Sequence, residues 1–300
     1  MTNEGVISIK FVNETKRAIP YITPMLIAII IVSIYPFVTG IVNSLFSKGL
    51  LSRKEMFVGL QNFAALFKDS LFWLGLKNNL IWTFSCVGME FILGMLIALL
   101  LNLPFVRFKN IYRALVLLPW ATPPVVAGLI WRYILSSTGP LNTMLKDSGI
   151  VPNPPSWLVT PGYSLLACIV TNIWMGLPFM TVMLLAGLQA IPRDIYEAAE
   201  IDGANAFRRL FSITLPVMKN IIAVVLILMC IWTFNMFDIV YVMTNGGPGN
   251  SSMILSLYGY QNAFAYHQKG YGAAIGVVSL LLLLFPISLY IKGASRHHEA

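Results

Sequence analysis

Six stretches of this chain are long and apolar enough to cross a lipid bilayer as helices. A spanning helix needs about 20 mostly apolar residues, and it keeps its backbone polar groups bonded where no water is available. We therefore predict an all-α, polytopic membrane protein with a six-helix transmembrane domain over residues 21–292, its first helix bent near Pro36. The predicted spans are Tyr21–Phe46, Leu76–Leu101, Tyr112–Leu135, Tyr163–Leu188, Ile221–Met243 and Ala273–Ile291.

The composition excludes an ordinary soluble, disordered or disulfide-stapled protein. Hydrophobic residues make up 57% of the chain and charged residues 11%, whereas a typical soluble domain has about 45–50% and about 25%. The net charge of +8 does not indicate nucleic-acid binding, because the basic residues lie between apolar segments and form no single patch. Cys86, Cys168 and Cys230 lie in apolar runs without a CxxC pair or a neighbouring histidine, so we expect no disulfide and no metal site.

Basic residues are unevenly distributed between the two sets of connecting segments. Twelve of the 20 Lys and Arg residues lie in the N-terminus, the second and fourth connections and the C-terminus, and seven lie in the first, third and fifth connections. Since cytoplasmic segments carry the excess of basic residues, we expect both termini to face the cytoplasm. Residues 1–20 are then a cytoplasmic N-terminal segment and residues 293–300 a cytoplasmic tail.

The three connections on the opposite side differ in character. Residues 59–71 have apolar side chains at helical spacing, which predicts a short interfacial helix. Residues 139–163 contain five prolines and predict an irregular loop, and the TNGGP turn at Thr244–Pro248 is expected to stop the fifth span. Aromatic residues near span ends are interpreted as interfacial anchors. These are Tyr21, Trp82, Trp120 and Tyr290.

The connection between the fourth and fifth spans, residues 191–220, has the pattern of a helix–turn–helix. Pro192 suits the first position of a helix, and Gly203 is a natural left-handed stop after it. A second amphipathic helix follows, and Leu215–Pro216 ends it and turns the chain back into the membrane. We predict a projecting knob whose small alanines let another protein approach closely. The alternative is a solvated loop with incidental helicity.

The spacing E-A-A-x3-G-x9-I-x-L-P is met in full in this loop, and it resembles the EAA motif of permease subunits of bacterial ABC importers. The matching residues are Glu197, Ala198, Ala199, Gly203, Ile213, Leu215 and Pro216. Flanking phrases are similar to those of the carbohydrate-uptake, maltose-type branch, over about residues 20–292. They are GLQNF at 59–63, ALLLN at 98–102, LLPW at 117–120, GLP at 176–178, LPV at 215–217 and TNGGP at 244–248.

The resemblance implies a set of partners. In such importers the EAA loop docks in a groove on a cytoplasmic ATPase, and here that role would fall to Glu197, Ala198, Ala199, Asp202 and Gly203. The chain has no G-x4-G-K-[ST] loop, so we expect no cofactor on this chain and place ATP and Mg on two partner ATPase subunits. The other expected partners are a second, homologous permease forming a heterodimer, an extracytoplasmic sugar-binding protein and the lipid bilayer of a bacterial or archaeal inner membrane.

Two spans carry residues suited to a sugar path, because sugars need aromatic faces for their apolar ring surfaces and polar groups for their hydroxyls. By the match to maltose-type permeases with a mid-membrane site, the candidates lie around the GLP phrase and before TNGGP. They are Met175, Gly176, Phe179, Trp232, Thr233, Asn235 and Met236. Interhelical packing is the alternative for each, and few amides are present for tight sugar binding. The pathway would lie between this subunit and its partner, and either subunit is a candidate for most of the contacts.

Two other function classes fit the sequence less well. An ion- or proton-driven secondary transporter needs paired intramembrane charges or broken-helix repeats, whereas Glu90 is a lone mid-span carboxyl that we interpret as an interhelical hydrogen-bonding group. A membrane-embedded enzyme is disfavoured because His267, His297 and His298 lie outside the spans and no HExxH constellation exists. Among sugars, monosaccharides, oligosaccharides and polyol phosphates all remain compatible.

Overall fold

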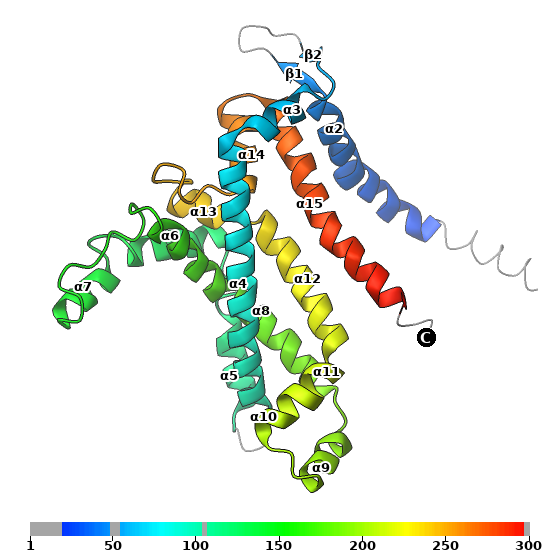
Figure 1. Cartoon of the computed structure of the whole chain (residues 1–300), viewed down its shortest axis with the longest axis vertical. Helices are drawn as coiled ribbons and strands as arrows, with labels where there is room; N and C mark the ends of the chain where they lie inside the picture. Colours follow the sequence, from blue (N-terminus) through cyan, green and yellow to red (C-terminus); the bar gives the residue numbers. More distant parts are fainter. Residues whose placement is uncertain (1–19, 49–54, 104–106, 297–300) are drawn as a thin grey trace, which may run out of the picture. The chain divides into compact units, whose positions relative to one another are not determined.

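The computed structural model describes residues 20–48, 55–103 and 107–296, and it is almost entirely helical (Figure 1). The described residues fall into two compact units, one from residues 20–48, 55–66 and 261–280 and one from residues 67–103, 107–260 and 281–296. Most of the predicted N-terminal segment, residues 1–19, and the last four residues of the predicted tail lie outside the described residues. The final helix continues to Arg296, so residues 293–296 of that tail are helical.

The first unit begins with a helix over Pro20–Ser44, which includes the π-helical turn η1 (Ile30–Ile34) and α2 (Tyr35–Ser44). Pro36 has no amide hydrogen, so the turn before it cannot keep a complete set of α-helical bonds. The π turn ends two residues before this proline, which is where the sequence predicts a bend.

Backbone carbonyls at the end of this first helix and just beyond it accept hydrogen bonds from a side-chain amide of the segment that follows. The antiparallel strands β1 (Phe46–Lys48) and β2 (Glu55–Phe57) follow the helix, and α3 (Gln61–Lys68) confirms that the predicted short segment is helical. Asn62 on α3 donates its Nδ2 hydrogens to the carbonyl oxygens of Ser44 and Phe46, at 2.7 and 3.0 Å. The unit also contains the π turn η3 (Gln261–Ala265) and the first part of α15 (Lys269–Arg296), where Gly270 lies so close to the Phe46 carbonyl that a Cβ would overlap it.

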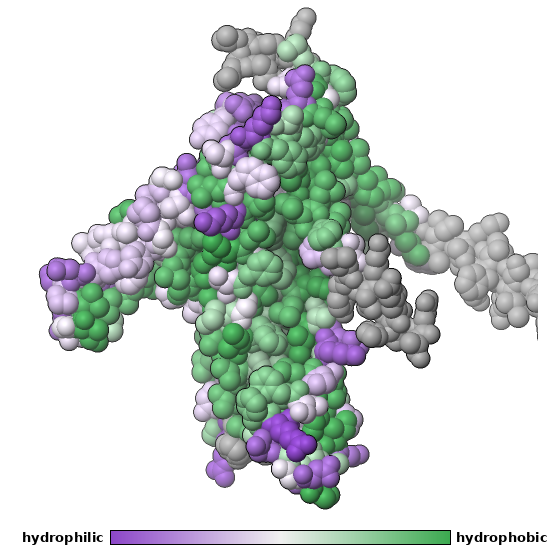
Figure 2. Space-filling model, viewed as in Figure 1, coloured by the Kyte–Doolittle hydropathy of each residue, from purple (hydrophilic) through white to green (hydrophobic). Residues whose placement is uncertain are grey.

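In the second unit, α4 (Ser70–Asn102) packs along α8 (Tyr163–Gln189) and α12 (Lys219–Asn235). Leucines and flexible, unbranched methionines fill the space between these helices. Helix α4 approaches α8 closely at Gly94, which faces Met180. Figure 2 shows hydrophobic residues over the middle of this unit and hydrophilic ones at the end with α9 and α10 and over α7. The core contains Val87, Met95, Ala98, Leu101, Met180, Leu184, Leu185, Leu188, Met218, Val225 and Met229.

The third predicted span is not one continuous helix. The structure divides it into α5 (Lys109–Leu117) and α6 (Pro124–Ile134), with a non-helical break between them. The break contains Pro119 and Pro123, and Pro124 is the first residue of α6. These prolines supply no amide donors, and Pro123, which precedes Pro124, has an extended ψ of 136°. At 11 residues α6 is about 16 Å long, too short to cross a bilayer alone. Five of the described helices are long and apolar enough to span.

The fifth predicted span is also interrupted, because α12 ends at Asn235 and a separate helix, α13, covers Asp238–Met243. The TNGGP turn then ends the helix as predicted. A hydrogen bond of 2.8 Å between the hydroxyls of Thr244 and Ser252 connects this turn to the residues that follow. In the proline-rich connection, α7 (Pro140–Asp147) precedes an irregular stretch whose Trp157 donates its Nε1 hydrogen to the Asn142 Oδ1 at 2.7 Å.

Buried polar side chains of α4 satisfy backbone groups at the end of α12 and the start of α14 (Leu255–Tyr260). Trp82 donates its Nε1 hydrogen to the Thr233 carbonyl at 2.8 Å, so its interpretation as an interfacial anchor is wrong. Asn79, fully buried, donates to the Phe234 carbonyl at 3.4 Å and accepts from the Leu255 amide at 3.2 Å. Helix ends leave such groups without intrahelical partners, so α4 acts as a cap for both ends.

We predict that Asn79→Ala destabilises the second unit, because it leaves a buried carbonyl and a buried amide without partners. A buried unsatisfied group costs about 1–3 kcal/mol, so the midpoint of thermal unfolding in detergent should fall clearly. The matched control is Asn110→Ala at an exposed position of α5. Equal unfolding midpoints for the two variants would show that the Asn79 amide does not stabilise these helix ends.

Candidate functional site

The 191–220 loop folds into two helices separated by a tight turn. The first, α9, covers Arg193–Ile201, with Pro192 one position earlier than predicted, at the cap. Gly203 has a φ of +71°, and a Cβ built on it would have no atom within 4 Å. Glycine is therefore favoured here for its backbone conformation and not for space. The predicted left-handed stop is confirmed.

The second half of the loop runs almost continuously into the next long helix. It consists of α10 (Ala206–Arg209), the π turn η2 (Leu210–Thr214) and α11 (Leu215–Val217), and α12 begins at Lys219. Asn205 caps the start by accepting the Arg208 amide hydrogen at 2.8 Å, a role that its asparagine before an amphipathic run could have indicated. The helix does not end at Leu215–Pro216 as predicted; the interruption falls at the buried Met218.

The motif residues do not share one surface. Glu197, Ala198, Asp202 and Gly203 are exposed, whereas Ala199 is buried against this chain, at 6% exposure. The two alanines therefore differ in what they can contact. Large apolar side chains extend the exposed surface of the loop, with Ile201 at 87% and Phe207 at 71% exposure. Exposed apolar groups beside a flat, small-residue helix surface are typical of a protein interface.

A second cluster of predicted residues lies among the long helices. The ring centroids of Phe179 on α8 and Trp232 on α12 are 4.9 Å apart. Phe179 also contacts Trp120, and the centroids of these two rings are 6.0 Å apart. Trp120 comes from the break between α5 and α6, so it is part of this aromatic cluster and not simply an interfacial anchor. Trp120 and Trp232 are each about half exposed, at 53% and 47%.

The other predicted pathway residues are placed differently. Met175 and Thr233 are buried in the helix packing, at 7% and 3% exposure. Asn235 is exposed and donates its Nδ2 hydrogen to the Ile231 carbonyl of its own helix at 2.8 Å. Met236 is half-buried at the end of α12, where its carbonyl accepts a hydrogen bond from the Ser256 hydroxyl at 3.3 Å. The structure thus groups Phe179 and Trp232 with Trp120 and leaves these four outside the ring cluster.

Glu90 joins α4 to α8 in the membrane-spanning core. It is fully buried, its Oε1 accepts a hydrogen from the Asn172 Nδ2 at 3.3 Å, and its Oε2 has no partner in the described part of the chain. Gly176 faces the same carboxyl, and a Cβ built there would overlap it. The predicted interhelical hydrogen bond is confirmed. The partner is a neutral amide, so this site lacks the paired charges of an ion-driven mechanism.

In the part of the chain that the structure describes, no group of three or more His, Cys, Asp or Glu side chains is arranged to hold a metal ion. Cys86, Cys168 and Cys230 are free thiols, the first two buried.

Long apolar helices with an exposed helix–turn–helix loop between α8 and α12 are the architecture of a multi-pass membrane protein. The family described as "Binding-protein-dependent transport system inner membrane component" matches residues 90–293, and the chain belongs to this family. It is thus a multi-pass membrane permease component of an ABC transporter and not the ATPase.

Relatives match over nearly their full length. The trehalose/maltose transport system permease protein MalF of Thermococcus litoralis is 36% identical over 97% of this chain and 98% of its own length. The sulfoquinovosyl glycerol transport system permease protein SmoG of Agrobacterium fabrum is 37% identical over 92% of this chain and 89% of its own. The arabinooligosaccharides transport system permease protein AraP of Bacillus subtilis is 35% identical over 94% of this chain and 91% of its own.

The fold is also that of a solved transporter. A chain in the crystal structure of a bacterial ABC transporter involved in the import of the acidic polysaccharide alginate superposes with a TM-score of 0.78. The match covers 94% of this chain and 99% of that chain at 24% identity.

We predict that Glu90→Gln keeps most of the transport activity, because a glutamine carbonyl can still accept the Asn172 hydrogen. Glu90→Leu is the contrasting variant, since it leaves the buried Asn172 amide without its partner. Transport by the complete, reconstituted complex is the measurement, with co-purification of its subunits as the assembly control. Abolished transport in a well-assembled Gln variant would instead indicate a titrating carboxyl.

Proposed function

We propose that this chain is the permease subunit of an ATP-driven importer and forms part of the transmembrane path for a sugar or oligosaccharide. The observation that supports this most strongly is the near full-length similarity, at 35–37% identity, to three permeases named for trehalose/maltose, sulfoquinovosyl glycerol and arabinooligosaccharide transport. The sugar would pass through without chemical change, by alternating access of the path to the two sides of the membrane.

The aromatic cluster of Trp120, Phe179 and Trp232 supports a carbohydrate cargo. Sugar rings have apolar C–H faces that pack on aromatic rings, and their hydroxyls need polar partners at the edges. Asn235, exposed one turn from Trp232, supplies an amide for such a hydroxyl. Met175, Gly176, Thr233 and Met236 would then shape the wall of the path behind the rings rather than stack on the sugar.

The energy source in this proposal is a pair of cytoplasmic ATPase subunits that bind ATP and Mg. The exposed Glu197, Ala198, Asp202 and Gly203 of the 191–220 loop would dock on one of them. A second, homologous permease would complete the path as a heterodimer, and an extracytoplasmic binding protein would deliver the sugar. Both termini would face the cytoplasm of a bacterium or archaeon, in agreement with the excess of basic residues on that side.

We predict that Trp232→Ala and Phe179→Ala each impair sugar uptake, because each removes a stacking surface from the same pair of rings. Membrane insertion and co-purification with the partner subunits should be unchanged. The measurement is uptake kinetics in vesicles that contain the whole complex. Phe264→Ala, at an exposed position of the first unit, is the matched control. Parental kinetics in both test variants would place the sugar contacts in the partner subunit.

We predict that Gly203→Val abolishes sugar-stimulated ATP hydrolysis and uptake, because a β-branched residue resists the φ of +71° at a cost of about 1–2 kcal/mol and tilts α9. Gly203→Asn is the matched control, since asparagine tolerates this conformation and no neighbouring atom obstructs its Cβ. Glu197→Lys should reduce the same activities by reversing a charge on the docking surface while α9 stays folded.

The assay is ATP hydrolysis by the reconstituted complex with its binding protein and sugar. The affinity of the binding protein for sugar serves as a negative control, because neither residue is near the path. Parental ATP hydrolysis and uptake in both Gly203→Val and Glu197→Lys would exclude the loop as the coupling element.

A further inference from the structure

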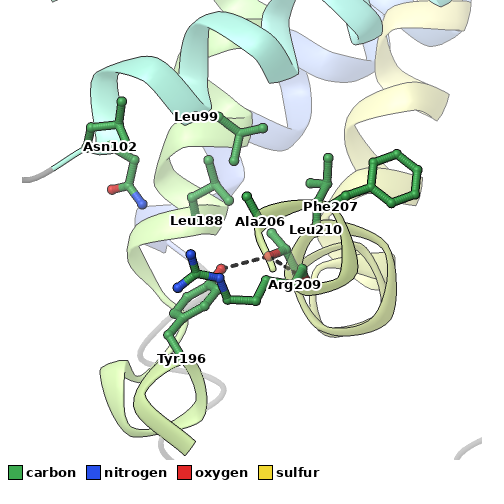
Figure 3. A pocket seen from close by; sticks show the side chains of 10 residues that line it. Leu99, Asn102, Leu188, Tyr196, Ala206, Phe207, Arg209 and Leu210 are labelled. Carbon is green, nitrogen blue, oxygen red and sulfur yellow. Dashed lines mark hydrogen bonds between the residues drawn. The ribbon is translucent and has the colours of Figure 1, made fainter. Parts of the chain in front are cut away.

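The two halves of the 191–220 loop are joined by side chains as well as by the turn between them. The Tyr196 hydroxyl on α9 and the Thr214 hydroxyl at the end of η2 are 2.9 Å apart. Glu200 on α9 and Arg209 on α10 form an ion pair. Figure 3 shows the Tyr196 side chain pointing across a cavity toward the segment that carries Arg209 and Leu210.

The direction of the Tyr196–Thr214 bond follows from a second contact. The Thr214 Oγ1 lies 3.2 Å from the Arg209 carbonyl, which can only accept, so the single threonine hydrogen is donated there. Tyr196 must therefore donate its hydroxyl hydrogen to Thr214. The result is a chain of two hydrogen bonds from α9 into the backbone of the second half of the loop.

The hydroxyl pair is the stronger of the two side-chain connections. Thr214 is 2% exposed, whereas the Glu200 side chain of the ion pair is 63% exposed. Exposed ion pairs contribute little because water and salt screen them, whereas breaking the part-buried hydroxyl pair leaves the buried Thr214 oxygen without its donor. The mechanical connection between α9 and η2 should therefore depend mainly on Tyr196 and Thr214.

The π turn places Thr214 where it can make both contacts. Pro216 supplies no amide hydrogen, and the Leu215 amide bonds to the Leu210 carbonyl five residues earlier instead of four. The same wide turn brings the Thr214 hydroxyl to the Arg209 carbonyl, also five residues earlier. Single π turns inside α-helices are frequent at functional sites.

Beyond Thr214 the chain is packed tightly enough to transmit a displacement. Met218 is 1% exposed, and a Cβ built on Gly187 of α8 would lie 2.7 Å from its Cε. The following residue, Lys219, starts α12, which carries Trp232 of the aromatic cluster.

Before Thr214 in the proposed route, a cavity of about 530 Å³ lies between the end of α4, α9 and the second half of the loop. Empty space transmits no force, so at this position a displacement of α9 reaches η2 through the side chains that cross the cavity. Leu99, Asn102, Leu188, Phe207 and Leu210 are among its lining residues.

We propose that Tyr196 and Thr214 are positioning residues that form a brace through which α9, moved by the ATPase, moves α12. This inference rests on the proposed function and adds to it the route by which the loop acts on the path. Loss of the brace should uncouple the complex: α9 would still dock and ATP would still be hydrolysed, but less of each stroke would reach α12.

The test uses Tyr196→Phe and Thr214→Val, which remove one hydroxyl each and keep the side-chain volume, in the whole complex reconstituted with binding protein and sugar. The number of ATP molecules hydrolysed per sugar imported should rise about fivefold, which corresponds to about 1 kcal/mol, the net contribution of one hydrogen bond. The double variant should be no more uncoupled than Thr214→Val alone, because Tyr196→Phe removes only the bond between the two hydroxyls, which Thr214→Val already removes. Thr214→Ser, which retains the hydroxyl, should restore the parental ratio.

Tyr112→Phe, at an exposed tyrosine of α5, is the matched control and should leave the ratio unchanged. The brace is rejected if the ratio stays at the parental value, if ATP hydrolysis and uptake fall in proportion, or if the two single effects add. A failure of the proposed function is a different result. In that case the parental complex itself shows no sugar-stimulated ATP hydrolysis, and both proposals are rejected.

Discussion

The structure depends on one constraint, which is that backbone groups at membrane depth must find partners inside the protein. Continuous helices meet this requirement alone, but each helix end leaves carbonyls or amides open. At the end of α12 the open carbonyls of Thr233 and Phe234 are met by Trp82 and Asn79 of α4. Because these capping groups come from α4, the shorter helices at this end of the second unit are fixed by the longest one.

The same constraint explains where the chain is interrupted. A proline removes a donor, and the turn before it must rearrange or the helix must stop. Before Pro36 and Pro216 the chain rearranges into π turns that end two residues earlier, and helical direction is kept. Pro119 and Pro123 lie in a break where the helix stops entirely, and the interruption brings Trp120 to Phe179. Interruptions of the helices are therefore also the places where candidate functional groups gather.

The two groups of candidate residues, in the 191–220 loop and in the aromatic cluster, lie in different parts of the second unit. In the 191–220 loop Glu197 and Ala198 are exposed and Ala199 is buried, so the motif contributes both to the surface and to internal packing. The aromatic cluster joins α8, α12 and the break between α5 and α6, and Glu90 holds α4 to α8 through the Asn172 amide. Since α12 follows directly from the loop through Met218, the two clusters belong to one connected piece of the protein.

The amino-acid sequence by itself determined the class of protein, the helical fold, the family and the position of the loop. These properties follow from local signals: the length of apolar runs, the spacing of the EAA motif and the left-handed preference of Gly203. Only the tertiary structure decided the roles of Trp82, Trp120 and Ala199, the breaks within the third and fifth spans, and the contact between Tyr196 and Thr214. Each of these depends on which residue from a distant segment of the chain lies in contact, and a local sequence pattern does not give contacts between distant segments.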